Sequence, residues 1–402
     1  MAVEVGDIPD AGAVVAVVAA VAMAMAAIVG RRRRNSGYFI RVVTFVQLIA
    51  SLRDAAEFKS MYRLTYEEFT QLHADICRSD PSYVGDPTKR CTESEMKLLS
   101  ALRFVAGGDA KDVAKSHGQS KASFWKHLKQ TLKVIVAAVP LVMPLDDAAA
   151  LKELERCCCC GRSFGRGAYR GCIGYLDGLI MPMEKPDLDN AGDFRCNRKD
   201  CYAINCQGIC DGRLRFTHFS AVCTGGTHDS AAFACTLLGQ RVEKGHATGG
   251  IPYPYYFGGD SAYKNGEALV VPVPGAERRS ESDNFNYVHS QFRSTIERAF
   301  GVFIRRFGVF WRPLRYGMDV NLLIIRAAVR LHNICMSRPA NAGENIGPLA
   351  SASEQAQQPS VEQVRQRYLD AYPDPLNLEK STGSVSRDAL IYHIKKAKIL
   401  RP

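Results

Sequence analysis

The chain has 402 residues, of which 47% are hydrophobic and 23% are charged, and these proportions exclude an intrinsically disordered protein. The length leaves room for about two or three domains, each with its own hydrophobic core. A net charge of +11 and an isoelectric point near 9.0 favour a polyanionic partner such as nucleic acid. Fourteen cysteines without a secretory signal favour reduced thiols in an intracellular compartment.

Residues 1–35 form a hydrophobic and arginine-rich extension of low complexity. Residues 11–30 are almost all Ala, Val, Met, Ile and Gly, and an arginine run follows at 31–34. This length approaches the roughly 20 residues that span a bilayer, but alanine contributes little transfer energy. A membrane anchor is therefore kept only as the less favoured alternative. We expect the arginine run to serve nuclear import or to contact DNA, and we expect the protein in the nucleus.

Residues 36–140 are predicted to form an all-α domain. Thr65 and Glu68 match the capping-box pattern at the start of a helix, and Thr92 and Glu95 repeat it. A short helix over 109–116, a break at 117–119 and a longer helix that begins after Ser120 have the outline of a helix-turn-helix. This domain is therefore predicted to bind DNA.

The second helix of this motif has a basic face that is separate from its apolar face. Phe124, Leu128 and Leu132 are spaced for packing against the rest of the domain. The other face would meet phosphates and base edges in the major groove. Its candidate DNA-binding residues are Lys121, Ser123, Lys126 and Lys129. A helical bundle with solvated lysines is the alternative, because helical spacing does not distinguish the two.

Residues 141–170 are predicted to be a linker that contains the cysteine run 157–160. Over 171–336, short apolar or alternating runs predict strands at 172–176, 202–210, 214–224 and 255–259. Asp211 and Gly212 predict a hairpin between the second and the third strand. With helices predicted at 229–238, 290–307 and 320–335, this region is expected to be a mixed α/β domain whose sheet is flanked by helices. Residues 337–402 are predicted to be a disordered linker and a basic tail.

Four carboxylates in the α/β region occupy positions that suit a metal-dependent nuclease. Asp177 and Asp260 each follow an apolar strand. Glu297 lies in a predicted helix, and Asp229 opens another. Acids at two strand ends and on a later helix can converge on two divalent cations, which clamp the attacking and leaving oxygens of a phosphodiester. Hard oxygen ligands favour Mg²⁺ or Mn²⁺ over zinc.

The predicted helix around Glu297 is strongly basic. Its arginines could hold a DNA backbone against the metals by bidentate contacts to phosphate. The candidate DNA-binding residues here are Arg293, Arg298, Arg305 and Arg306. In the alternative, Glu297 is a surface acid that pairs with the arginines around it.

Other side chains invite a metal interpretation that the spacing does not favour. A zinc site could be imagined from Cys196, Cys201, Cys206, Cys210 and His218, but these residues match no common zinc finger. We expect buried structural thiols instead. His332 lies on a predicted helix that is apolar nearly all round, so we expect a core histidine with satisfied hydrogen bonds.

Several motifs of this region resemble those of the PIF/Harbinger transposases and their domesticated nuclease relatives. They are Gly-Tyr-Leu-Asp-Gly at 174–178, Asn-Arg-Lys-Asp-Cys-Tyr-Ala-Ile-Asn-Cys-Gln-Gly-Ile-Cys-Asp at 197–211, Gly-Gly-Thr-His-Asp-Ser at 225–230, Gly-Asp-Ser-Ala-Tyr at 259–263, His-Ser-Gln-Phe-Arg-Ser-Thr-Ile-Glu-Arg-Ala-Phe-Gly at 289–301 and Leu-His-Asn-Ile at 331–334. The resemblance runs from 171 to 336, with the motifs in the family's order.

The resemblance implies an RNase H-like DDE catalytic domain behind a helix-turn-helix domain. It implies that Asp177, Asp260 and Glu297 are the catalytic, metal-binding acids and that Asp229 is a further metal ligand. It also implies a Myb-like partner protein for targeting to DNA, and self-association into a homo-oligomer is left open. The predicted function is a DNA endonuclease or transposase with a two-metal DDE mechanism. The alternative is a domesticated DNA-binding regulator that does not cleave.

Overall fold

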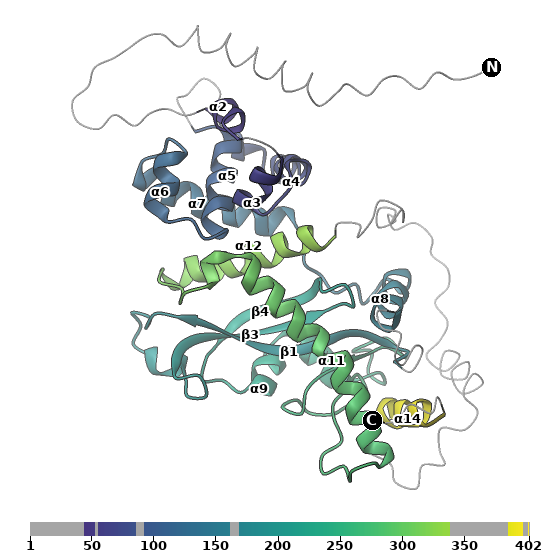
Figure 1. Ribbon diagram of the computed structural model, residues 1–402. Coiled ribbons are helices and arrows are strands. Elements are labelled where there is room, and N and C mark those ends of the chain that lie inside the picture. The colour runs from purple at the N-terminus through teal and green to yellow at the C-terminus, as the bar shows by residue number, and fades with distance from the viewer. Residues whose placement is uncertain are drawn as a thin grey trace, which may run out of the picture. The chain divides into compact units, whose positions relative to one another are not determined.

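A computed structural model describes residues 44–52, 55–85, 92–160, 169–337, 385–396 and 401 of the chain. The chain divides into two compact units, Met1–Val139 and Pro140–Pro402 (Figure 1). The predicted extension at 1–35, with its candidate membrane segment and its arginine run, lies outside the described residues. None of the described helices is long and apolar enough to cross a membrane.

The N-terminal unit is built from helices throughout its described residues. They are α2 (Phe45–Ala50), α3 (Ala55–Tyr62), α4 (Tyr66–Ser79), the short 3-10 helix η1 (Pro81–Tyr83), α5 (Ser94–Val105), α6 (Ala110–Ser116) and α7 (Lys121–Ala138). Their apolar faces meet in one core, in which Phe69, Leu99, Phe124 and Leu128 are almost fully buried.

One of the two predicted capping boxes is confirmed. The Thr65 hydroxyl accepts a hydrogen bond from the Glu68 amide at 3.2 Å, and the Glu68 carboxylate accepts one from the Thr65 amide at 2.7 Å. The second prediction, a capping box of Thr92 and Glu95, is wrong. Helix α5 begins at Ser94 with Glu93 as N-cap, and no side chain caps it. Glu95 instead accepts a hydrogen bond from the Ser94 hydroxyl, which lies inside the helix.

Helices α6 and α7 follow the predicted order of short helix, turn and longer helix. Asp109 caps α6, and Ser120 caps α7 by accepting a hydrogen bond from the Ser123 amide. The turn between them is anchored in the core, since the Gln119 side chain donates to the Ser100 hydroxyl at 3.0 Å. Gly118 has a φ of +65°, a conformation that glycine adopts without strain.

The C-terminal unit contains a mixed six-stranded sheet, as the strand pattern predicted. Its strands are β1 (Cys172–Met183), β2 (Arg195–Cys196), β3 (Cys201–Cys210), β4 (Phe216–Thr224), β5 (Tyr256–Gly258) and β6 (Leu269–Val270). The order is β2-β3-β1-β5-β6, and β4 also pairs with β3. The β1–β3 and β3–β4 pairs are antiparallel, whereas β5 runs parallel to both β1 and β6.

Strand β1 is longer than the sequence predicted. We expected it to end at 176, but it continues to Met183 because its antiparallel partner β3 pairs with it as far as Tyr202. Its parallel pairing with β5 reaches only Tyr175, which lies opposite Gly258. Asp177 therefore stands just beyond the point where one of the two neighbours of β1 ends.

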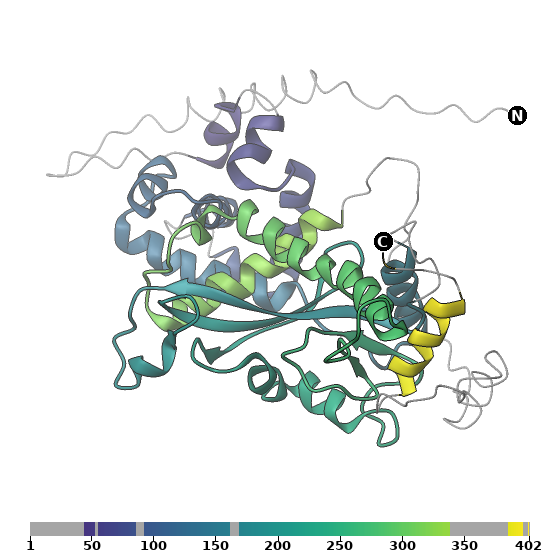
Figure 2. The same cartoon turned by 60° about the horizontal axis from the view of Figure 1, so that its bottom comes forward.

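Helices cover both faces of the sheet (Figure 2). The long α11 (Glu281–Arg306) and α12 (Met318–Met336) lie on one face, where Phe292 of α11 stacks on Tyr175 and Phe300 stacks on Phe216. The other face packs against α9 (Asp229–Ala234) and α10 (Leu237–Lys244), whose Phe233 and Leu238 share a core with strands β1, β3 and β5. The single helix predicted at 229–238 is thus two helices, since Thr236 caps a new one.

The predicted linker at 141–170 is wrong for residues 148–160, which form α8 (Ala148–Cys160). Leu151 and Leu154 join the sheet core, and Cys157 and Cys158 are also buried. The helix fits closely over the β3–β4 hairpin: a Cβ on Gly212 would lie 2.0 Å from the Cys157 carbonyl oxygen. Cys157, Cys158 and Cys159 therefore form part of the packing surface of α8.

The prediction of a disordered tail over 337–402 is also wrong in part. Residues 385–396 form α14 (Val385–Lys396), which lies beside α11 (Figure 1). Its Leu390 and Ile394 are buried, and Lys395 pairs with Glu281 of α11 at 2.7 Å. Apolar residues that were too few to predict a helix from sequence are thus buried by tertiary packing.

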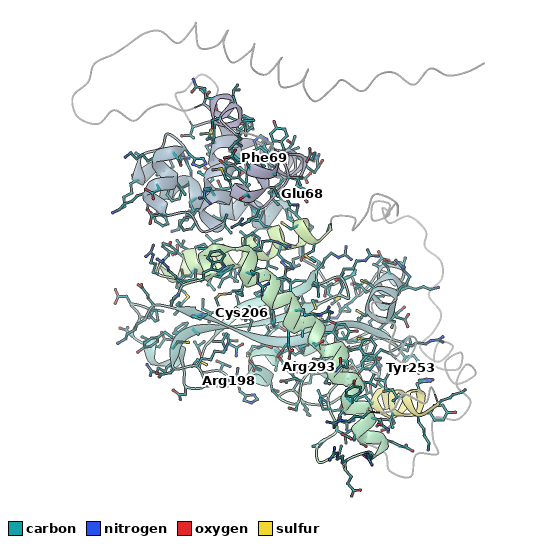
Figure 3. The ribbon with its side chains drawn as sticks, viewed as in Figure 1. Glu68, Phe69, Arg198, Cys206, Tyr253 and Arg293 are labelled. Atoms are coloured by element: carbon teal, nitrogen blue, oxygen red, sulfur yellow. The ribbon has the colours of Figure 1, made fainter. Side chains whose placement is uncertain are left out.

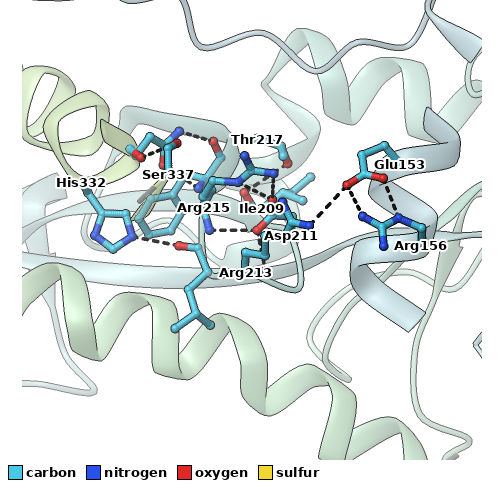
Figure 4. Close-up of polar contacts among 12 residues, drawn as sticks. Glu153, Arg156, Ile209, Asp211, Arg213, Arg215, Thr217, His332 and Ser337 are labelled. Atoms are coloured by element: carbon cyan, nitrogen blue, oxygen red, sulfur yellow. Dashed lines mark hydrogen bonds and ion pairs between the residues drawn. The ribbon is translucent and has the colours of Figure 1, made fainter. Parts of the chain in front are cut away.

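The predicted hairpin between β3 and β4 is confirmed and is fixed by a buried acid (Figure 4). Asp211 is fully buried and accepts hydrogen bonds from the amides of Arg213 and Arg215, each at 2.9 Å. Its carboxylate also pairs with the Arg215 guanidinium at 2.7 Å. Beside it, the His332 ring donates to the Leu214 carbonyl at 2.8 Å, so His332 is the satisfied core histidine that was predicted.

Candidate functional site

Asp177 is held at the middle of the sheet with its side chain toward α11. Its carboxylate accepts a hydrogen bond from the Gly178 amide at 2.8 Å and is 19% exposed. Arg293, from the middle of α11, lies 3.3 Å from the same carboxylate; Figure 3 labels Arg293 on this helix.

Arg293 joins two of the predicted acids through a single nitrogen. Its Nη1 lies 3.3 Å from Asp177 Oδ2 and 2.7 Å from Glu297 Oε1. Glu297 follows Arg293 by four residues, so the two project from one face of α11. The structure thus brings Asp177 and Glu297 to one shared positive charge, although 116 residues separate Asp177 from Arg293.

A buried histidine holds the residue that precedes Asp260. The His289 ring, from α11, donates from Nε2 to the carbonyl of Gly259 at 2.7 Å. Because a carbonyl only accepts, the proton is on Nε2, and Nδ1 accepts from the buried Tyr169 hydroxyl. His289 therefore ties the residue before Asp260 to the helix that carries Arg293 and Glu297.

The charges of these acids act on one another. The pKa of Asp177 is raised to about 6, chiefly by burial; the Gly178 amide and the Arg293 guanidinium lower it, and the charges of Asp260 and Glu297 contribute smaller increases. Burial also raises the pKa of the Tyr263 hydroxyl, and Asp177, Asp229 and Asp260 add to the shift. The Tyr263 hydroxyl therefore feels the charge of all three aspartates.

Asp229 reaches this region from the opposite face of β1. Asp177 and Gly178 are consecutive strand residues, so they point to opposite faces. A Cβ on Gly178 would lie 2.4 Å from Asp229 Oδ1, which shows that Asp229 packs where Gly178 has no side chain. Asp229 is 14% exposed and lies 3.9 Å from Arg198. The structure does not bring it into contact with Arg293, the residue that joins Asp177 and Glu297.

The donor set fits hard divalent cations in its chemistry. Carboxylate oxygens are the ligands that Mg²⁺ and Mn²⁺ prefer. Burial is the main cause of the raised pKa of Asp177, and the charges of Asp260 and Glu297 add to it. The Arg293 guanidinium supplies positive charge between two of these acids. Across the described ranges, no three His, Cys, Asp or Glu side chains are arranged so that they could hold a metal ion together. The acids would have to rearrange around Arg293 to bind one.

The four predicted DNA-binding arginines of α11 have different surroundings. Arg298 and Arg305 are exposed, as a phosphate contact requires. Arg306 instead turns inward and contacts the His332 ring at 3.1 Å and the Met336 sulfur at 3.4 Å, which ties α11 to α12. Arg293 contacts the acids.

The predicted DNA-binding residues of α7 lie on its solvent side. Lys121, Lys126 and Lys129 are exposed, and Ser123 is half-buried near His127. Phe124 and Leu128 are buried on the other side of the helix. This arrangement is compatible with both a DNA-reading helix and a solvated bundle helix.

The cysteines considered for a zinc site are dispersed among buried positions. Cys206 and Cys210 are fully buried in β3, and burial raises the pKa of both thiols. All described cysteines are free thiols.

Sequence reasoning missed several polar residues around the acids. Arg293 was predicted to contact DNA. No role was predicted for His289, Asn205, Gln207 or Tyr263. One signal was available: Asn205 and Gln207 are two amides at alternate positions of an apolar strand, which places both on one face. The contacts of Tyr263 and His289 arise only from the tertiary fold.

We expect acid to destabilise the C-terminal unit through two buried histidines. Burial lowers the pKa of His289 and of His332 to about 4. Unfolded histidine takes up its proton near pH 6.5, so between 6.5 and about 4 the unfolded state binds more protons. The free energy of unfolding should fall as the pH falls through this window, by up to about 3 kcal/mol for each histidine.

This pH dependence can be measured by urea denaturation at pH 7.5, 6 and 5. The raised pKa of Asp177 contributes with the opposite sign between its ordinary value and about 6, so the Asp177→Asn variant gives the cleaner comparison. A stability that does not change between pH 7.5 and 5 would contradict the buried, neutral state of these histidines.

Comparison with known proteins identifies the region that contains all four acids. Residues 176–333 match a family model described as DDE superfamily endonuclease. Searches of curated proteins and of solved structures gave no match. The mixed sheet flanked by helices is consistent with an RNase H-like DDE domain. On this match, residues 176–333 are similar to DDE superfamily endonucleases.

Proposed function

We propose that this protein is a DNA endonuclease or transposase of PIF/Harbinger type that works by a two-metal DDE mechanism. The observation that carries the proposal is that Arg293 lies 3.3 Å from Asp177 and 2.7 Å from Glu297, while Asp260 follows β5, the strand that runs parallel to β1. The similarity of residues 176–333 to DDE superfamily endonucleases supports it. We also propose that the protein acts in the nucleus and that a Myb-like protein targets it to DNA.

The acids would hold two Mg²⁺ or Mn²⁺ ions, with Asp229 as a further ligand. When bound, such ions activate the attacking water or 3′-hydroxyl and stabilise the leaving oxygen of the phosphodiester. Asp177 lies in β1 two residues beyond the end of its pairing with the parallel strand β5, and Asp260 follows β5. Glu297 of α11 shares the Arg293 guanidinium with Asp177. The exposed Arg298 and Arg305 would hold the DNA backbone along the same helix.

The N-terminal unit would supply DNA affinity through α7. Its exposed lysines can contact phosphates, and its short-helix, turn, long-helix order suits the major groove. Phosphate contacts alone carry no sequence information. These lysines would therefore account for affinity for DNA but not for recognition of a particular DNA sequence.

Arg293 is expected to compete with the metal ions. Its guanidinium lies between Asp177 and Glu297, where it neutralises the charge that a cation would need. Arg293→Gln should therefore bind Mn²⁺ about fivefold more tightly in the absence of DNA, as expected for the loss of an ion pair of about 1 kcal/mol. Isothermal titration of the full-length variant with Mn²⁺ measures this change.

Arg298→Gln is the matched control for Arg293→Gln. It removes the same charge from the same helix, but Arg298 contacts Thr295 at 3.3 Å and neither acid by any hydrogen bond or ion pair of the described structure. Its Mn²⁺ affinity should equal that of the wild type. Equal or weaker Mn²⁺ binding by Arg293→Gln would show that Arg293 does not occupy the place of a cation.

Nicking of supercoiled plasmid by the full-length chain tests the proposed function. We expect open-circular DNA in Mg²⁺ or Mn²⁺ and none in EDTA. DNA binding without nicking in either metal would instead favour the alternative, a domesticated regulator that retains the fold and its basic surfaces.

A further inference from the structure

Trp311 exposes a large aromatic ring to solvent just beyond the end of α11. It follows the short 3-10 helix η3 (Gly308–Phe310), and 63% of the residue is exposed. An indole is one of the largest apolar groups that a fold can bury, so folding alone does not explain its place in solvent. Scattered exposed apolar residues are normal on protein surfaces, so the surroundings of this ring decide whether it serves a ligand.

The ring of Trp311 is held in one orientation. Its Nε1 donates to the carbonyl of Ile304 at 3.1 Å, in the last turn of α11, where carbonyls lack amide partners within the helix. The backbone is fixed on both sides as well. The Trp311 amide donates to the Gly308 carbonyl at 3.1 Å, and the Leu314 amide donates to the Pro182 carbonyl of β1 at 3.0 Å. The hydrogen bond of Nε1 fixes the polar edge of the indole and leaves the exposure of its face to be explained.

The surface around Trp311 is strongly positive. Between Glu297 and Asp319 the sequence contains arginines and no acid. Arg305 follows the residue whose carbonyl binds the indole, and Arg312 follows Trp311 itself. A polyanion therefore suits this surface. The arginines of this segment that are exposed are Arg298, Arg305, Arg312 and Arg315.

The same helix leads from this surface to one of the candidate catalytic acids. Glu297, Gly301 and Arg305 are each four residues apart and all exposed, so they form one row on α11. In the described part of the chain, no neighbouring atom lies within 4 Å of where a Cβ on Gly301 would stand, so the row is open. Glu297 and Ile304 are about 10 Å apart along the helix axis. A DNA strand at Glu297 therefore has a short path to Trp311.

We propose that Trp311 stacks on an unpaired base of the DNA substrate, and that Arg305 and Arg312 hold the phosphates beside that base. This inference rests on the proposed function as a DNA endonuclease or transposase. A side-chain ring stacks on a base whose face is accessible, whereas each internal base of a duplex is covered by its neighbours. The ligand is therefore single-stranded or locally opened DNA. Every base has an aromatic face, so this site adds affinity without sequence specificity.

The fluorescence of Trp311 tests this proposal directly. The chain has two tryptophans, and the other, Trp125, belongs to the N-terminal unit. In the full-length Trp125→Phe variant, all tryptophan emission comes from Trp311. We expect single-stranded oligothymidine of about 15 nucleotides to quench this emission. A covalently closed, relaxed duplex circle should leave it unchanged, because the circle has neither ends nor unpaired bases. EDTA in every sample keeps the measurement independent of metal.

Two substitutions of Trp311 separate stacking from the hydrogen bond to Ile304. Trp311→Leu removes the aromatic face, and affinity for labelled oligothymidine, measured by fluorescence anisotropy, should fall about tenfold. Trp311→Phe loses the hydrogen bond and keeps a ring, so it should retain most of this affinity. Affinity for the duplex circle, measured by competition, should be unchanged in both variants. If Trp311→Leu does not fold by thermal denaturation, the quenching of Trp311 decides the question alone.

Two further variants are controls for the loss of an exposed apolar side chain and for the loss of charge. Leu237 of α10 is 82% exposed, and Leu237→Ala should change affinity for neither form of DNA. Arg312→Gln should weaken binding of the strand and of the circle by similar factors, because both contain phosphate.

The contrary outcomes are distinct from a failure of the proposed function. Equal quenching by the strand and the circle would overturn the proposal, since the ring would then respond to DNA without an unpaired base. Wild-type affinity for oligothymidine in a folded Trp311→Leu variant would also overturn it. Loss of self-association in that variant, seen by analytical ultracentrifugation, would then assign the ring to a contact between two copies of the chain. Plasmid nicking without quenching would overturn this inference alone, and quenching without nicking would overturn the proposed cleavage alone.

Discussion

Replacing Asp177 by asparagine is expected to abolish metal-dependent DNA cleavage and to stabilise the metal-free fold. The Asp177 side chain is 19% exposed and pairs with Arg293, and its pKa is raised to about 6, chiefly by burial. Its ionised form therefore costs folding free energy at neutral pH, and the neutral amide should recover about 1–3 kcal/mol of it. Cleavage should fall at least about a thousandfold, or about 4 kcal/mol of transition-state stabilisation.

Plasmid nicking and urea denaturation at pH 7.5 without metal measure the two effects. Asp187→Asn is the control, because Asp187 is an exposed acid that follows the same strand. It should change neither activity nor stability. A destabilised Asp177→Asn would show that the acid supports the fold, and a variant that still cleaves would remove Asp177 from the chemistry.

Replacing Asp211 by alanine is expected to cost about 3–5 kcal/mol of stability, the range for breaking one side of a buried ion pair. Asp211 is fully buried, accepts two backbone hydrogen bonds in the β3–β4 turn and pairs with Arg215. Alanine would leave both turn amides and the Arg215 guanidinium without this acceptor. Urea denaturation of the full chain should show the loss in the transition of the C-terminal unit.

Two further variants separate the charge of Asp211 from its turn hydrogen bonds. Asp211→Asn keeps an acceptor for the amides and loses the charge, so its cost should lie between those of the wild type and the alanine variant. Asp200→Asn removes the 83%-exposed acid that pairs with Arg195, and it should change stability by less than about 0.5 kcal/mol. A cost below about 1 kcal/mol for Asp211→Ala would mean that the turn holds without its acid.

Much of the C-terminal fold could be predicted because its strands are short apolar runs with clear turn signals. The β3–β4 hairpin follows directly from Asp211 and Gly212. The first and last residues of helices and strands were less predictable, because packing against other parts of the fold determines them. Helix α11 was expected from 290, but it begins at Glu281, where Ser280 caps it and Phe285 and Val288 are buried. Helix α8 was missed because four consecutive cysteines do not form an obvious amphipathic pattern.

The acids of the candidate site could be predicted, but their partners could not. Asp177 and Asp260 follow apolar strands, and Glu297 stands out as an acid among arginines. That Arg293 contacts Asp177 depends on how α11 crosses the sheet, which no local pattern encodes. The same holds for His289, which reaches Gly259 across 30 residues of sequence.

Anomalous diffraction from crystals of the full-length chain grown with Mn²⁺ tests most directly whether these acids form a metal centre. We predict a manganese peak bound by Asp177 together with Asp260 or Glu297, with oxygen distances of about 2.0–2.3 Å. We also predict that Arg293 has moved away from Asp177. Saturating Mn²⁺ that leaves Arg293 between Asp177 and Glu297, with no manganese at these acids, would show that the acids do not form a metal centre.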